Sequence, residues 1–152
     1  MDKLPEIAIQ TINRIFAEAA YMFVDKINEI DGSLLDPDQF EGVSLMFGGE
    51  WSGEFRLWGN SRFAAQAAAN MLGIDENGDL ARSKGLDAMK ELLNMIAGNF
   101  LTAAFGDQPK FEQGLPMSLD KKFFEDDLKK DNALLLEVEG NPVIFIVNFI
   151  GD

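Results

Sequence analysis

Residues 80–105 read LARSKGLDAMKELLNMIAGNFLTAAF, a stretch that predicts one long helix with two distinct faces. At about 100° per residue, the apolar side chains fall on one stripe, the expected core side: Leu86, Met89, Leu93, Ile96, Ala97, Phe100 and Ala104. A second face, pointing away from the stripe, carries polar or small residues: Asp87, Glu91, Asn94, Gly98 and Thr102. Gly106 follows at the expected end of the helix.

Two residues on the second face, Glu91 and Asn94, are spaced to act on one target. They are three positions apart, so they are neighbours on the helix surface. Gly98 lies one turn beyond Asn94. It costs about 1 kcal/mol of helix propensity relative to Ala, but it leaves a shallow spot that another backbone could approach. Most helices also have a solvated polar face, so this spacing alone leaves both a functional and a purely structural interpretation open.

Other patterns along the chain predict one α+β domain over residues 1–152, with long helices packed on a mostly antiparallel sheet. Helical spacing favours a first helix over Pro5–Ile30, followed by a loop to Gln39. Turn and cap residues predict a hairpin between Gly42 and Gly59 and a second helix from the Asn60-Ser61 cap to Met71. Strands are then expected at Met117–Phe124, Asn132–Glu139 and Val143–Ile150, giving the order α-ββ-αα-βββ.

The closing strand, Val143–Ile150, is apolar at seven of its eight positions. A strand of this kind is usually covered on both faces. It fits a central strand covered by helices, and it also fits a sheet that crosses between subunits.

Composition narrows the possible partners and locations. The net charge is −13, from 26 Asp and Glu against 13 Lys and Arg. This charge repels nucleic acid and anionic membrane surfaces, and it favours a partner with a basic rim. The first residues, Met1–Ile9, include acidic side chains and Pro5 where a signal peptide would be basic and then apolar. No stretch is apolar enough to span a membrane, so we expect a cytoplasmic protein.

The chain contains no histidine and no cysteine. This excludes a Ser-His-Asp triad, thiolate nucleophiles and zinc sites built from Cys or His. Carboxylates and amides remain as the available chemistry. Asp75–Asp79 superficially resembles a calcium loop, but Leu80 stands where the EF-hand pattern needs its sixth-position glycine. We therefore expect a turn there and no metal site on this chain.

A longer pattern joins the polar face to a distant proline: Asp87-x3-Glu91-x2-Asn94, then twenty-one residues, then Pro116. This resembles the signature of the CheC/CheX/FliY family of chemotaxis phosphatases, an acidic or serine residue followed by Glu, Asn and a distant Pro. The order of helices and strands also resembles that family's α+β fold. CheC-type members carry two such motifs, whereas the first helix here offers only Gln10 and Asn13 without the glutamate. The resemblance is therefore to the single-site CheX type.

The resemblance implies a hydrolase acting on the aspartyl phosphate of a phosphorylated CheY-like response regulator in two-component signalling. It implies that Asn94 orients the attacking water and that Glu91 pairs with the regulator's lysine. Asp87 and Gly98 would line the contact surface, and Pro116 would shape the loop after the helix. Mg²⁺ is expected in the regulator, with no cofactor on this chain. The resemblance also implies a homodimer joined through a β-sheet.

Two other functions remain open at this point. The domain could bind a response regulator or a flagellar switch without catalysing turnover. It could also be a metal-dependent hydrolase that uses its many carboxylates. Assays with and without a regulator, and with titrated metal, separate these alternatives.

Overall fold

One antiparallel sheet runs through the computed structural model, which describes residues 3–107 and 110–150. The strands are β1 (Val24–Lys26), β2 (Phe40–Gly49), β3 (Ser52–Asn60), β4 (Phe111–Gln113), β5 (Met117–Leu119), β6 (Leu134–Val138) and β7 (Asn141–Ile150). The helices are α1 (Leu4–Ala20), α2 (Ser61–Leu72), α3 (Asp79–Phe105) and the short α4 (Phe124–Leu128). The strand order is β1-β6-β7-β3-β2-β4, and β5 also pairs with β2.

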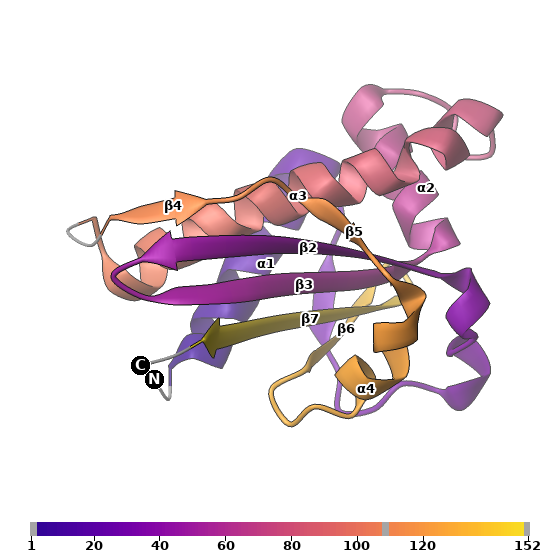
Figure 1. The fold of residues 1–152 in the computed structure, drawn as a ribbon. Coiled ribbons are helices and arrows are strands. Elements are labelled where there is room, and N and C mark those ends of the chain that lie inside the picture. The colour runs from indigo at the N-terminus through magenta and orange to yellow at the C-terminus, as the bar shows by residue number, and fades with distance from the viewer. Residues whose placement is uncertain (1–2, 108–109, 151–152) are drawn as a thin grey trace.

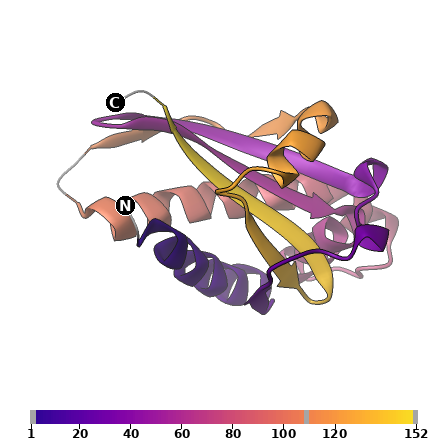
Figure 2. The same cartoon turned by 90° about the horizontal axis from the view of Figure 1, so that it is seen from below.

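The helices are divided unequally between the two faces of the sheet (Figure 1). The three long helices α1, α2 and α3 share the main hydrophobic core with the sheet. The short α4 lies on the opposite face, over a second and smaller core. Figure 2 shows this layering from below, with indigo α1 on one side of the sheet and orange α4 on the other. The predicted α+β class, with long helices on an antiparallel sheet, is confirmed.

The hairpin and the two helices after it form as predicted. β2 pairs with β3 from Phe40 opposite Asn60 to Phe47 opposite Gly53. The Asn60 side chain caps α2 by accepting a hydrogen bond from the Phe63 backbone N–H at 2.8 Å. Gly106, at a φ of 78°, follows α3. Local cap and turn chemistry therefore set these boundaries.

The first helix is shorter than predicted. It ends at Ala20, where Tyr21 adopts a left-handed conformation with a φ of 55°, and it does not continue to Ile30. The chain instead forms β1, in which Val24 pairs with Val138 of β6. Met22 and Val24 are buried while Phe23 between them is exposed, which is the alternation of a strand. The same apolar residues also fit a helical spacing, and this ambiguity caused the error.

The region after α3 differs from the expected three strands. β4 was not predicted, and it pairs antiparallel with the end of β2, Gln113 opposite Phe47. The strand expected over Met117–Phe124 ends at Leu119, and α4 begins at Phe124. Phe124 packs into the second core against Phe40, with ring centroids 4.5 Å apart. Phe124 is therefore one of the contacts that hold α4 against the sheet.

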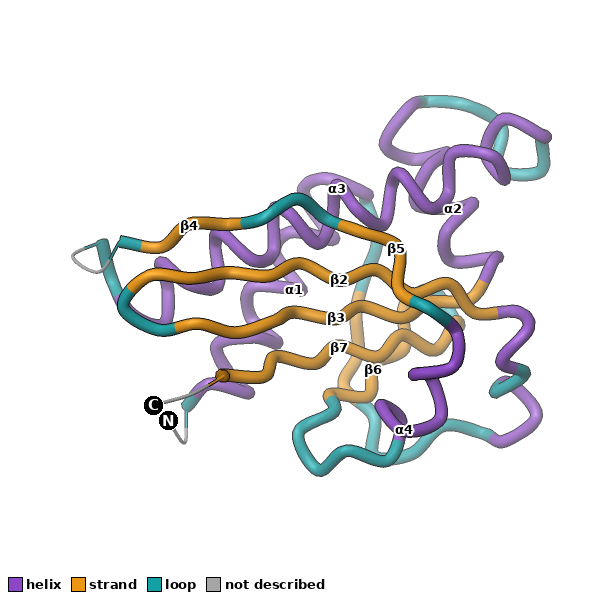
Figure 3. The backbone as a smooth tube through the Cα atoms, in the orientation of Figure 1, coloured by secondary structure: helices purple, strands orange, loops and turns teal. Residues whose placement is uncertain are grey.

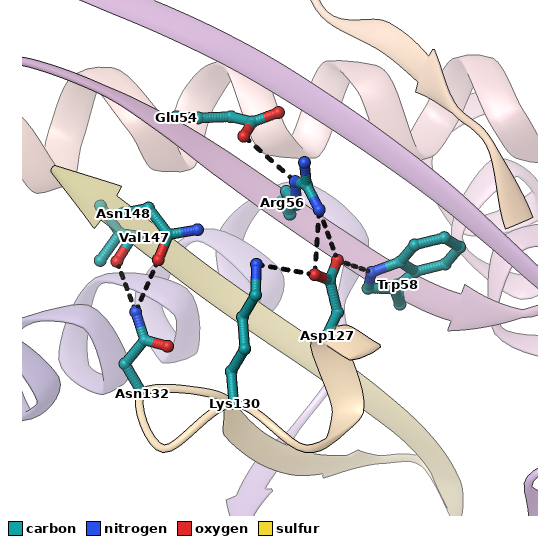
Figure 4. Close-up of polar contacts among 8 residues, drawn as sticks. All are labelled: Glu54, Arg56, Trp58, Asp127, Lys130, Asn132, Val147 and Asn148. Carbon is teal, nitrogen blue, oxygen red and sulfur yellow. Dashed lines mark hydrogen bonds and ion pairs between the residues drawn. The ribbon is translucent and has the colours of Figure 1, made fainter. Parts of the chain in front are cut away.

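The closing strand β7 is central and covered on both faces, as its composition predicted. Val143 and Phe145 face the main core, while Ile144 and Ile146 face the second core. β7 lies between β3 and β6, but the β6 pairing stops at Phe145. Beyond that point Asn132 donates hydrogen bonds to the Val147 carbonyl at 3.0 Å and to Asn148 Oδ1 at 2.9 Å (Figure 4).

A buried carboxylate, Asp127 on α4, ties the second core to the sheet (Figure 4). Its side chain is 1% exposed and accepts hydrogen bonds from Arg56 at 2.9 Å and from Trp58 Nε1 at 2.8 Å. Lys130 Nζ lies 2.9 Å from the same carboxylate. Burial alone would raise the pKa of Asp127, but the hydrogen bonds from these three donors outweigh burial and lower it.

Candidate functional site

The polar face of α3 points to solvent, as its periodicity predicted. Met89, Leu93 and Phe100 are fully buried on the core side of this helix. Asp87, Glu91 and Asn94 are exposed, and Gly98 is half-buried. All four predicted site residues therefore lie on one long helix whose opposite side is anchored in the main core.

A further residue, Gln113 of β4, lays its side chain across this face. Its Nε2 donates to the backbone carbonyl of Asn94 and to Asn94 Oδ1, both at 3.3 Å. A Cβ added at Gly98 would come within 2.9 Å of Gln113 Oε1. The shallow spot predicted at Gly98 is thus partly occupied by the chain's own glutamine. Sequence reasoning missed Gln113 because it belongs to a three-residue strand that was not predicted.

A hollow beside Glu91 is lined by the end of α2 and the first half of α3. Met71 and Leu72 line it from α2, and Lys84, Asp87 and Ala88 line it from α3. Leu72 is one of the large apolar side chains left exposed. The surface next to Glu91 therefore combines apolar side chains with both a positive and a negative charge.

Pro116 lies in the connection between β4 and β5, which runs along the edge of β2 beside α3 (Figure 3). The backbone N–H of Gly114 donates to the Met46 carbonyl at 2.7 Å and holds this connection against β2. Leu115 next to it is 82% exposed. This connection therefore places an apolar side chain at the same edge of the sheet as β4 and its Gln113.

The incomplete second motif lies on α1. Gln10 and Asn13 are both exposed on that helix. Their neighbour Arg14 donates to Asn99 Oδ1 of α3 at 2.9 Å and links the two helices. Like Asn94, Asn13 is an exposed asparagine on a helix. Unlike Asn94, it has glutamine and not glutamate three residues before it.

Residues 3–107 and 110–150 offer neither a cluster of metal ligands nor a membrane-spanning helix. In that part of the chain, no three side chains of the His, Cys, Asp or Glu type gather closely enough to hold a metal ion. The loop at Asp75 is a turn, in which the Asn77 N–H donates to Asp75 Oδ1 at 3.0 Å. Within the same residues, no helix combines the length and the apolarity that a membrane span needs.

The family model for the chemotaxis phosphatase CheX matches residues 42–138, which span the hairpin, α2, α3 and Gln113. This chain belongs to that family. The predicted membership of the CheC/CheX/FliY family, most like CheX, is therefore confirmed. No curated protein sequence matches the chain significantly.

Solved structures of CheX proteins share the fold. One is the complex of CheX with CheY, BeF₃ and Mg²⁺ from Borrelia burgdorferi, with a TM-score of 0.66 and 17% identity. That match covers 95% of this chain and 96% of the other. CheX from Desulfovibrio desulfuricans has a TM-score of 0.68 and 12% identity, covering 97% and 99% of the two chains. CheX from Vibrio vulnificus has a TM-score of 0.63 and 15% identity, covering 97% and 99%.

Proposed function

We propose that this CheX-family chain is a hydrolase that accelerates dephosphorylation of a CheY-like response regulator in the cytoplasm. The observation that carries the proposal is the exposed pair of Glu91 and Asn94 on a helix anchored in the core. Two further facts support it: the family is one of chemotaxis phosphatases, and the Borrelia CheX was solved together with CheY, BeF₃ and Mg²⁺. BeF₃ is a chemical stand-in for a phosphoryl group.

Asn94 is proposed to orient the attacking water. In the reaction, the water oxygen forms a bond to phosphorus while the bond between phosphorus and the aspartyl oxygen breaks. The products are inorganic phosphate and a free carboxylate. Such a transfer depends mainly on positioning and on stabilisation of charge. An amide can accept a hydrogen bond from water and donate one at the same time, and it stays neutral beside the phosphoryl oxygens.

Glu91 is proposed to pair with the lysine of the regulator's site. It lies one helical turn before Asn94 on the same exposed face, so one docking movement brings both side chains to the partner. Exclusion of water on docking would strengthen the ion pair. Glu91 therefore sets the register in which Asn94 meets the phosphoryl group.

The remaining contacts follow from the same docking geometry. Asp87 and Gly98 lie before and after the pair on α3 and would line the contact surface. The metal, Mg²⁺, would belong to the regulator and stabilise the phosphoryl charge there, with no cofactor held by this chain. The net charge of −13 favours a partner with a basic rim around its site.

The test compares two exposed asparagines on neighbouring helices. Phospho-regulator labelled with ³²P is mixed with wild type, Asn94→Ala or Asn13→Ala, and the decay of label is followed. Loss of one well-placed polar group typically costs about 100-fold or more in rate, so we expect Asn94→Ala to lose acceleration and Asn13→Ala to retain it. Equal decay with wild type and Asn94→Ala would reject the proposal.

The same assay distinguishes a binding module without catalysis. Such a protein would bind phospho-regulator, while the label would decay at its intrinsic rate with wild type and variants alike. A metal-dependent hydrolase would instead release phosphate from a small acyl phosphate without regulator, in proportion to added metal.

A homodimer joined through the sheet is a further part of the proposal. Within the described residues, β7 has no β6 partner opposite Val147–Ile150, so part of its edge remains free of strand pairing. Asn132 occupies some of that edge through its bonds to Val147 and Asn148. Light scattering over a range of concentrations tests the dimer, and a monomer mass throughout would reject it.

A further inference from the structure

We infer that Gln113 is a positioning residue that holds the Asn94 amide in one orientation for the reaction. The inference rests on the proposed function and adds a residue from outside the helical motif. Gln113 Nε2 reaches both the backbone carbonyl and Oδ1 of Asn94, at 3.3 Å each. The Nε2 group carries two hydrogens and can donate one to each acceptor. The bond to the backbone carbonyl holds Gln113 on α3, and the bond to Oδ1 constrains the Asn94 side chain.

The backbone of Gln113 is held firmly enough to serve this purpose. β4 pairs with β2, with Gln113 directly opposite Phe47. Phe111, two residues earlier, packs against an aromatic group, with its ring centroid 5.7 Å from that of Phe105 and 6.0 Å from that of Trp51. Strand pairing and aromatic packing therefore fix the backbone position from which the Gln113 side chain extends.

Gly98 provides the space through which Gln113 reaches Asn94. A Cβ at position 98 would lie 2.9 Å from Gln113 Oε1, closer than real Cβ atoms come to other heavy atoms. The glutamine amide would have to move to accommodate it. This gives a reason for a residue that weakens the helix by about 1 kcal/mol relative to Ala to stand in the C-terminal half of α3.

The contact decides which end of the Asn94 amide faces the partner. Because Gln113 donates to Oδ1, that oxygen is drawn toward β4 and the Nδ2 group is directed away from it. One lone pair of Oδ1 and both Nδ2 hydrogens remain available for water and phosphoryl oxygens. Without Gln113 the amide can rotate freely about its terminal torsion, and a misplaced group lowers the rate without changing docking.

The kinetic test uses Gln113→Ala, Gln113→Glu and Gly98→Ala over a range of phospho-regulator concentrations. We expect about tenfold lower kcat for Gln113→Ala, with KM unchanged, because positioning acts on chemistry and not on docking. Gln113→Glu should lower kcat at least as much, since a carboxylate cannot donate to Oδ1. Glu112→Ala, an exposed truncation on the same strand, should match wild type.

Gly98→Ala provides a readout that a merely structural role would not give. Alanine raises helix propensity, so Tm should stay equal or rise while kcat falls. If Gly98→Ala acts through Gln113, the double variant with Gln113→Ala should be no slower than Gln113→Ala alone. A rise in KM with kcat unchanged in the Gln113 variants would overturn the inference and make Gln113 a docking residue.

A second measurement needs no regulator. The Asn94 side-chain NH₂ resonances are assigned in a ¹⁵N spectrum by their loss in Asn94→Ala. We expect Gln113→Ala to shift them and Glu112→Ala to leave them in place. If Asn94→Ala abolishes activity while Gln113→Ala affects neither kcat nor these resonances, the positioning inference fails and the proposed function stands. If Asn94→Ala is fully active, the proposed function itself has failed.

Discussion

Asp127 and Asn94 are held in opposite ways on opposite sides of the molecule. Asp127 is 1% exposed and is bound by Arg56 and Trp58 at normal hydrogen-bond distances, with a lowered pKa. Asn94 is exposed, and Gln113 contacts it through one donor at 3.3 Å. The Asp127 cluster resembles an active site by the usual criteria of burial and perturbed charge. In this protein the cluster joins α4 to the sheet, because Arg56 and Trp58 belong to β3.

The difference shows what each kind of site requires. A cluster that stabilises the fold must satisfy all its charges internally, because a buried unpaired charge is costly. A side chain that acts on another protein must keep hydrogen-bonding capacity unused and must stay accessible. Asn94 meets that requirement, since it is constrained on one side and open on the other. The comparison predicts that changes at Asp127 alter stability, whereas changes on α3 alter activity.

The largest expected effect on stability comes from Asp127→Asn. This change removes the carboxylate that Arg56 and Lys130 share. Arg56 keeps Glu54, whose Oε1 lies 3.1 Å from its Nε, so we expect the loss of the hydrogen bonds to a charged group to cost about 2 kcal/mol. Urea unfolding measures the loss, and Glu125→Ala, an exposed acidic residue on α4, is the matched control with a change within about 0.5 kcal/mol. Dephosphorylation per folded molecule should remain as in wild type. A loss of activity at full folding would mean that the comparison between the two regions is wrong.

A smaller effect is expected from Glu91→Gln on α3. The substitution keeps the size of the side chain and removes its charge, so the free energy of unfolding should change by no more than about 0.5 kcal/mol. Losing an ion pair at the docking surface should raise KM about fivefold and weaken the dependence of KM on salt. Stopped-flow dephosphorylation at several ionic strengths measures both quantities. An unchanged KM with an unchanged salt dependence would remove Glu91 from the docking contact.

The parts of the fold that sequence predicted are those governed by local chemistry. The Asn60 cap, the glycine after α3 and the periodicity of α3 involve neighbouring residues. β1 was missed because it depends on pairing with β6 at the far end of the chain. The exposure of Asn94 was predicted like the other local features, because it follows from the periodicity of α3. Gln113 could not be found, because the contact joins residues nineteen positions apart through a strand of three residues.

The smallest effect, and the sharpest test of the Asp127 cluster, is its pH dependence. The pKa of Asp127 is lowered in the folded protein, so between the two pKa values the unfolded chain binds more protons than the folded one. The stability from Asp127 is therefore fully present above the unfolded pKa of about 3.9 and is lost as pH falls through the lower folded value. The difference in unfolding free energy between wild type and Asp127→Asn should be constant from pH 7 to about pH 5 and shrink below about pH 4. Urea titrations at each pH measure this difference. Because all other carboxyls are common to both proteins, a difference that stayed constant at low pH would show that the Asp127 charge does not fasten α4.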